Sequence, residues 1–117
     1  MVDEEKLEKK GFIMLVKRSN KPITQKLVNQ ILNREFANKV KKMGIVITNS
    51  YYTHGNYDWV ICFNANDIKD AKTFVEIYSE LYEGHISEIN LIEIMFTAVS
   101  SGVTNPEIEK LEDFFKI

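Results

Sequence analysis

A histidine, a carboxylate and three aromatic side chains lie close together in one short stretch of the chain: Tyr52, His54, Tyr57, Asp58 and Trp59. A histidine titrates near neutral pH, so it can act as a general base or a metal ligand. A carboxylate beside aromatic rings can hold a polar group at the mouth of an apolar pocket. These five residues form the candidate ligand-binding site, and catalysis by His54 is the alternative interpretation.

The same residues also have structural interpretations. His54 can be a simple turn residue, and Asp58 can accept hydrogen bonds from backbone N–H groups at the start of a strand. The sequence contains no phosphate-binding loop, no nucleophile paired with a base and no metal-ligand spacing, and Cys62 is its single cysteine. We therefore expect neither a metal nor a cofactor, and the sequence leaves any catalytic residue unknown.

A hairpin must position these side chains. Gly55 and Asn56 both tolerate a positive φ, as tight hairpin turns require, and they separate two stretches with β-type composition. Apolar residues at three-to-five-residue steps predict two long amphipathic helices, each ended by a glycine, Gly44 or Gly84. The expected strands are 12–17, 45–53, 57–64 and 86–97, and the expected helices are 23–43, 68–81 and 105–116.

This order of elements predicts an α+β fold in a single domain covering residues 1–117, with a core at about 12–98. Strand-helix-strand-strand-helix-strand is the ferredoxin-like βαββαβ arrangement. Right-handed crossovers place both long helices on one face of a four-stranded antiparallel sheet. The segment from about 105 to 116 is an extra C-terminal helix, and its apolar residues predict that it docks on its own or a partner's domain.

The opposite face of this sheet is expected to need a partner. In the first, third and fourth strands, apolar residues point to both faces, whereas a sheet face in water alternates apolar and polar residues. A soluble monomer does not normally expose so large an apolar surface. A second copy, packed sheet to sheet, covers it in a closed two-fold arrangement. The sequence therefore predicts a homodimer through the sheet face.

The hairpin also resembles the signature of the GYD domain family, through Thr53, Gly55, Tyr57-Asp58 and Val60. The resemblance covers about residues 12–98 and implies a dimeric α/β barrel, the superfamily to which GYD domains belong. It leaves three functions open: a small-molecule-binding or assembly domain, an enzyme similar to the monooxygenases and isomerases of related barrels, or an effector sensor. The last follows because amino-acid-sensing domains of transcription regulators have a similar Gly-x-Tyr-Asp hairpin.

The charge distribution bears on the partners of the protein, and its hydropathy bears on its location. The net charge is −2, but residues 1–42 carry +6 and residues 43–117 carry −8. The basic half could bind an anion, but solvated helix faces explain it as well, and the acidic half argues against nucleic acid as a partner. The apolar run 12–16 is too short to span a membrane. With one cysteine and no visible signal peptide, the expected location is the cytoplasm.

Overall fold

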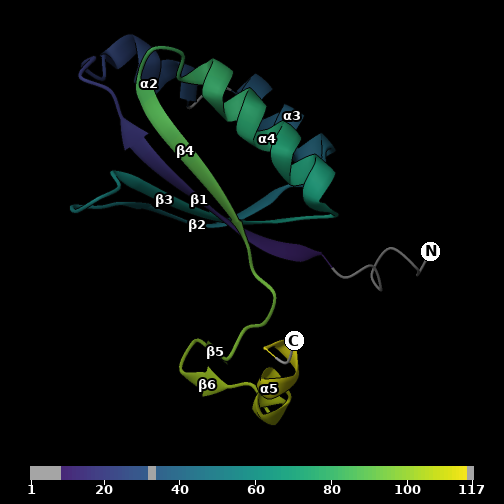
Figure 1. Cartoon of the computed structure of the whole chain (residues 1–117). Helices are drawn as coiled ribbons and strands as arrows, with labels where there is room; N and C mark the ends of the chain where they lie inside the picture. The colour runs from purple at the N-terminus through teal and green to yellow at the C-terminus, as the bar shows by residue number, and fades with distance from the viewer. Residues whose placement is uncertain (1–8, 32–33, 116–117) are drawn as a thin grey trace.

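The ferredoxin-like fold is present. A computed structural model describes residues 9–31 and 34–115, and its elements follow the predicted order (Figure 1). One antiparallel sheet has the strand order β2-β3-β1-β4, with the helices together on one face (Figure 1). The strands and helices of this domain are β1 (Lys10–Arg18), α2 (Gln25–Ile31), α3 (Arg34–Lys42), β2 (Val46–Tyr52), β3 (Trp59–Ala65), α4 (Ile68–Leu81) and β4 (Ile86–Glu93).

The expected helix 23–43 is described as two helices, α2 and α3, on either side of residues 32–33, which lie outside the described residues. α2 begins after Thr24, whose side-chain oxygen accepts a hydrogen bond from the Leu27 N–H at 3.2 Å. Gly44 has φ +77°, so it ends α3 in the left-handed conformation as predicted. Asp67 caps α4, because its carboxylate accepts the Asp70 N–H at 2.8 Å.

The core lies between the helices and one face of the sheet. Alternate residues of β1 and β3 point into it, and Phe12 and Phe63 stack there with ring centroids 5.6 Å apart. Phe74 of α4 packs edge-on against Phe63 at 4.8 Å. The buried residues from these three elements are Phe12, Met14, Val16, Trp59, Ile61, Phe63, Ala65, Ala71, Phe74 and Tyr78.

Among the residues that the structure describes, none covers the opposite sheet face, which is partly apolar, as predicted. We call it the open face. Ile13 lies in the middle, paired with Cys62 of β3 on one side and with Ile92 of β4 on the other. Ile92 is 44% exposed, and Ile13 and Cys62 are half-buried. Other apolar residues of the open face are Leu15, Val46, Tyr51 and Val60.

The end of the chain differs from the prediction. β4 ends at Glu93, four residues before the expected end of the strand, and a hairpin follows, formed by β5 (Val99–Ser100) and β6 (Val103–Thr104). The expected helix 105–116 is reduced to a 3₁₀ turn, η1 (Ile108–Lys110), and a short helix, α5 (Leu111–Phe114); residue 116 lies outside the described part. We call residues 95–115 the C-terminal arm.

The hairpin turn of the arm explains the change. Ser101 has φ +50° and Gly102 has φ +79°, and two positive φ values in succession are the geometry of a tight hairpin turn. Asn105 fastens the hairpin, because its side-chain amide donates to the Thr97 carbonyl at 2.9 Å. Figure 1 shows the arm beyond the end of β4, apart from the sheet and helices of its own chain. Docking of this segment on its own domain, one of the two predicted options, is therefore not observed.

Gly55 has the positive φ expected of it, +128°, although the turn is longer than the three residues, 54–56, between the expected strands. The connection between β2 and β3 runs from Thr53 to Asp58, and the Thr53 N–H donates to the Asp58 carbonyl at 2.8 Å. Asn56 does not adopt the positive φ that it could tolerate. Ser101 is the one non-glycine residue in the described chain with a positive φ.

Replacing Gly55 by valine is expected to cost about 1–3 kcal/mol of unfolding free energy, because a β-branched residue is strained at this φ. No heavy atom lies within 4 Å of the position a Cβ would take, so the cost comes from the backbone and not from a clash. Asn56→Val is the matched control and is expected to change stability by less than about 0.5 kcal/mol. Urea unfolding of both variants checks this, and equal midpoints would contradict it.

Candidate functional site

Four of the five predicted site residues meet in one pocket. It measures about 410 Å³ and lies where β1 ends and the β2–β3 connection begins. Tyr52, His54, Asp58 and Trp59 line it, together with Thr53 and Arg18. We call it the hairpin pocket.

Two aromatic rings form its apolar wall. Tyr52 is the last residue of β2 and Trp59 the first of β3, and the two are direct partners across the strands. Their rings meet edge to face, with centroids 6.0 Å apart and planes at 81°. Trp59 is 6% exposed and Tyr52 is 77% exposed, so one side of the wall is fixed in the core and the other is open to a ligand.

The fixed ring is held from behind by two tyrosines. Tyr82 packs against Trp59 at 5.0 Å and against Tyr78 at 4.6 Å. Burial raises the pKa of Tyr78 well above its usual range, with the neighbouring Tyr82 adding to the effect. Burial likewise raises the pKa of Tyr82, so both phenols stay protonated and neutral at physiological pH. Trp59 is therefore backed by an uncharged aromatic cluster.

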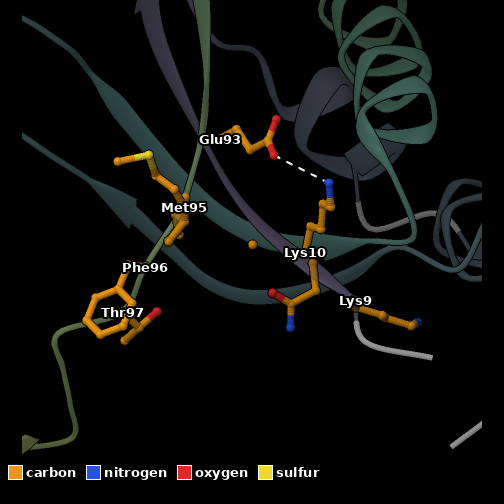
Figure 2. Close-up of a pocket in the computed structure, with 9 residues that line it drawn as sticks. Lys9, Lys10, Glu93, Met95, Phe96 and Thr97 are labelled. Carbon is orange, nitrogen blue, oxygen red and sulfur yellow. Dashed lines mark ion pairs between the residues drawn. The ribbon is translucent and has the colours of Figure 1, made fainter. Parts of the chain in front are cut away.

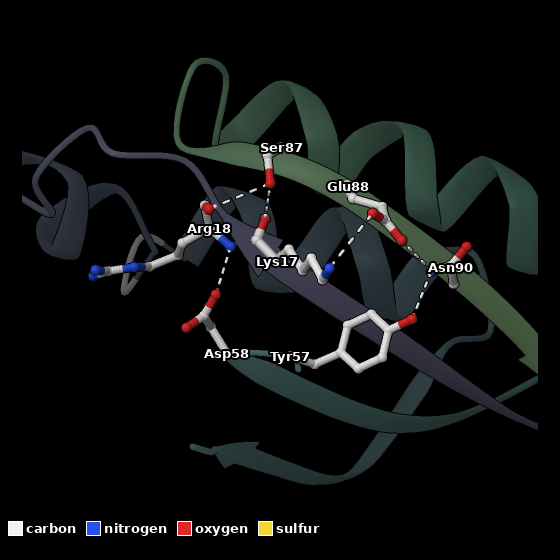
Figure 3. Close-up of polar contacts among 7 residues, drawn as sticks. All are labelled: Lys17, Arg18, Tyr57, Asp58, Ser87, Glu88 and Asn90. Carbon is white, nitrogen blue, oxygen red and sulfur yellow. Dashed lines mark hydrogen bonds and ion pairs between the residues drawn. The ribbon is translucent and has the colours of Figure 1, made fainter. Parts of the chain in front are cut away.

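Asp58 has the structural role that the sequence allowed for it. Its carboxylate accepts the Arg18 N–H at 2.8 Å, and its own N–H donates to the Val16 carbonyl at 2.8 Å (Figure 3). The two bonds tie the β2–β3 connection to the end of β1. Asp58 thus positions the hairpin pocket through the backbone of the neighbouring strand.

Arg18 was not among the predicted site residues. Figure 3 shows its guanidinium pointing away from the other labelled side chains, and in residues 9–31 and 34–115 it forms no ion pair. Alternation along β1 is the signal that could have found it, because Val16 faces the core and Arg18 is the next residue on that side. An unpaired guanidinium beside aromatic rings is suited to a planar anion.

Tyr57 does not line the hairpin pocket. Its hydroxyl accepts a hydrogen bond from the Asn90 amide at 3.0 Å, and the Lys17 ammonium lies 5.7 Å from its ring centroid (Figure 3). Asn90 pairs with Leu15 and so belongs to the open face. Lys17 also forms an ion pair with Glu88 at 4.0 Å, so polar groups border one end of the open face.

His54 lies exposed at the edge of the hairpin pocket. In the described part of the chain it shares no hydrogen bond with Asp58, whose carboxylate binds the backbone of Arg18 instead. Nor does that part contain a group of three or more His, Cys, Asp or Glu residues placed to hold a metal ion. The arrangement as it stands can bind and orient a ligand through charge and aromatic contact.

A second pocket of about 500 Å³ lies where the C-terminal arm leaves the sheet (Figure 2). Its charged groups already have partners, because Lys10 lies 3.7 Å from the Glu93 carboxylate and Lys9 donates to the Gly44 carbonyl at 2.8 Å. Ile94, Met95 and Phe96 supply its apolar part. With its charges paired, this pocket is less suited to a charged ligand than the hairpin pocket.

Comparison with known proteins supports the fold. No protein-family model matches the chain, and no curated protein matches it. Solved structures do match. An AsnC family transcriptional regulator from Agrobacterium tumefaciens is 12% identical, with a TM-score of 0.53, and the match covers 86% of this chain and 59% of that one. AsnC from E. coli is 13% identical, with a TM-score of 0.51, over 86% and 60%.

A third match has a length closer to that of this chain. The solution structure of a hypothetical Arabidopsis thaliana protein is 12% identical, with a TM-score of 0.52, and the match covers 79% of this chain and 91% of that one. The chain spans about three fifths of the length of the two regulators. At these identities the matches show a shared ferredoxin-like fold. In the described residues, no helix is both long and apolar enough to cross a membrane.

Proposed function

We propose that this protein is a homodimeric, GYD-like domain that binds a small carboxylate-bearing molecule in the hairpin pocket. The Arg18 side chain carries the proposal, because it lines the same pocket as the Tyr52–Trp59 wall and forms no ion pair with the residues that the structure describes. A carboxylate on Arg18 forms two parallel charge-assisted hydrogen bonds, and an apolar or aromatic group on the same molecule packs against the rings.

Three residues of the GYD-like signature, Thr53, Gly55 and Asp58, have roles that support this pocket. Thr53 closes the connection, because its hydroxyl donates to the Tyr57 carbonyl at 2.7 Å. Gly55 supplies the positive φ, and Asp58 holds the end of β1. The signature therefore builds the pocket entrance instead of supplying reactive groups, which favours a binding domain over an enzyme.

Sensing of an effector is the second candidate. The fold is shared with structures described as AsnC family regulators, and the chain matches about three fifths of their length. In this second candidate function, the ligand of the hairpin pocket is the effector. Because Cys62 is a free thiol, we also place the protein in the cytoplasm. The acidic half of the chain, residues 43–117, makes nucleic acid an unsuitable partner.

Arg18→Ala tests the binding proposal. Native mass spectrometry of the purified protein first shows whether a metabolite copurifies, and calorimetric titration with free amino acids and aromatic carboxylates then measures affinity. Arg18→Ala is expected to weaken binding at least tenfold, since charge-assisted hydrogen bonds are worth about 1.5–3 kcal/mol. Lys72→Ala, on the exposed surface of α4, is the control and should leave affinity unchanged. Equal affinity in both variants, or no binding of any carboxylate, would overturn the proposal.

A further inference from the structure

The C-terminal arm exposes apolar residues along its whole length. Val99 is 56% exposed, Val103 is 68% exposed and Phe115 is 66% exposed. Met95, at the root of the arm, is more than half exposed as well. Scattered single apolar residues are normal on a protein surface, but a short segment that carries four of them indicates a contact surface.

The arm is also too small to be stable alone. Its strands are two residues long and α5 is four residues long. Isolated hairpins and helices of this size are marginal in water, because they bury too little surface to offset the loss of chain entropy. Asn105 links its parts, donating to the Thr97 carbonyl and accepting the Glu107 N–H, both at 2.9 Å. A segment held together by such local bonds needs a larger surface to pack against.

The arm points toward the side where a second copy would lie. The last contact with the sheet is the Ile94 N–H, which donates to the Gly11 carbonyl at 2.8 Å. Beyond it, Figure 1 shows the arm on the side of the sheet away from α3 and α4, which is the side of the open face. Stacked sheets lie only about 10 Å apart. A second sheet on the open face would therefore lie beside the arm.

Charge favours the same partner. The segment from η1 through α5 is acidic, with Glu107, Glu109, Glu112 and Asp113 against one lysine, Lys110. α3 is basic, with Arg34, Lys39, Lys41 and Lys42 against one glutamate, Glu35. The arm and α3 of one chain lie on opposite sides of the sheet (Figure 1). The acidic segment can therefore approach this basic helix only on another copy.

We propose that the C-terminal arm clasps the second subunit of the dimer, with Val103 and Phe115 against the partner and the acidic segment facing the partner's basic helix layer. The inference rests on the proposed homodimer and extends its interface beyond the open face. Two-fold symmetry makes the contact reciprocal, because each arm lies on the other chain. The occupant of the arm's apolar surface is thus a second copy of this chain.

Photo-crosslinking tests the contact directly. Val103 is replaced by p-benzoylphenylalanine in the full chain, and ¹⁵N-labelled and unlabelled protein are mixed before irradiation. A covalent dimer is expected, with mixed-isotope peptides joining the arm to the partner. The same probe at Lys72, on the exposed surface of α4, is the control and should give no dimer. Links within one chain only, or no link at position 103, would overturn the proposal.

A disruption experiment completes the test. The variant Val103→Glu is expected to raise the dimer dissociation constant at least tenfold in sedimentation equilibrium, with unchanged circular dichroism. Thr104→Glu, which pairs with Val99 on the opposite face of the same hairpin, is the control and should change it less than threefold. The proposal requires both the interchain link and this shift. A dimeric wild type that lacks either result overturns the clasp alone, whereas a monomeric wild type overturns the homodimer with it.

Discussion

Replacing Ile92 by lysine is expected to convert the proposed dimer into monomers. Ile92 lies on the open face, paired with Ile13 of β1, and sheet packing would bury it against the second copy. A lysine there would place an unpaired charge in an apolar interface, a change that costs about 3–5 kcal/mol. Since about 1.4 kcal/mol is a factor of ten, the dissociation constant should rise roughly a hundredfold or more. Sedimentation velocity over a concentration series measures the change.

Two further variants separate the interface from the fold. Thr73→Lys adds the same charge to the exposed surface of α4 and should leave the dimer intact. Ile89 is partly buried against the core on the helix side, so Ile89→Lys should unfold the domain instead of dissociating it. A wild type that sediments as a monomer at micromolar concentration, or an Ile92→Lys variant that remains dimeric, would contradict the interface.

Replacing Trp59 by alanine is expected to destabilise the domain by about 3–5 kcal/mol, the range measured for deletion of large buried aromatic side chains. Trp59 is almost fully buried and packs between Tyr52 and Tyr82. Its loss leaves a cavity in front of the tyrosine cluster and removes the fixed wall of the hairpin pocket. Thermal and urea unfolding of the purified variant measure the cost, and a loss below about 1 kcal/mol would contradict the packing.

Tyr52→Ala is the matched control for that change. Tyr52 forms the exposed side of the same wall, so its removal should cost less than about 1 kcal/mol of stability while still weakening ligand binding. A large stability loss in Tyr52→Ala would show that the exposed ring has a structural role. Comparison of the two variants thus distinguishes a residue that binds from one that also supports the fold.

The ferredoxin-like domain was predictable because its signals are local. Helical spacing, the cap at Asp67 and the left-handed glycines at 44 and 84 all depend on a few neighbouring residues. The end of β4 was not predictable in this way. Residues 94–97 are as apolar as the strand before them, but in the register of β4 Phe96 falls opposite Lys9, one residue before β1 begins at Lys10, so in the described chain the pairing does not continue past that point. The hairpin that follows had its own signal, Ser-Ser-Gly-Val, which the apolar pattern on both sides concealed.

The site depended on information that a single segment does not contain. The five candidate residues lie close together along the chain, from Tyr52 to Trp59. Their side chains, however, do not all lie on the same face of the sheet. Tyr57 turns to the open face, where Asn90 binds it, and Arg18 joins from a strand 40 residues away in sequence from Asp58. Alternation along β1 places Arg18 on the side of Val16, and the structure shows that Arg18, and not Lys17, lines the pocket.

The adjacency of Lys17 and Arg18 has a thermodynamic consequence. These neighbours point to opposite sides of the same strand end, Arg18 to the hairpin pocket and Lys17 to the border of the open face. The Ser87 hydroxyl contacts both of their carbonyls at 3.3 Å, so a displacement of one peptide is passed to the other (Figure 3). A ligand in the hairpin pocket and a partner on the open face would therefore both bind at the same end of β1. By reciprocity, whatever factor the ligand applies to the dimerisation constant, dimerisation applies to the affinity for the ligand.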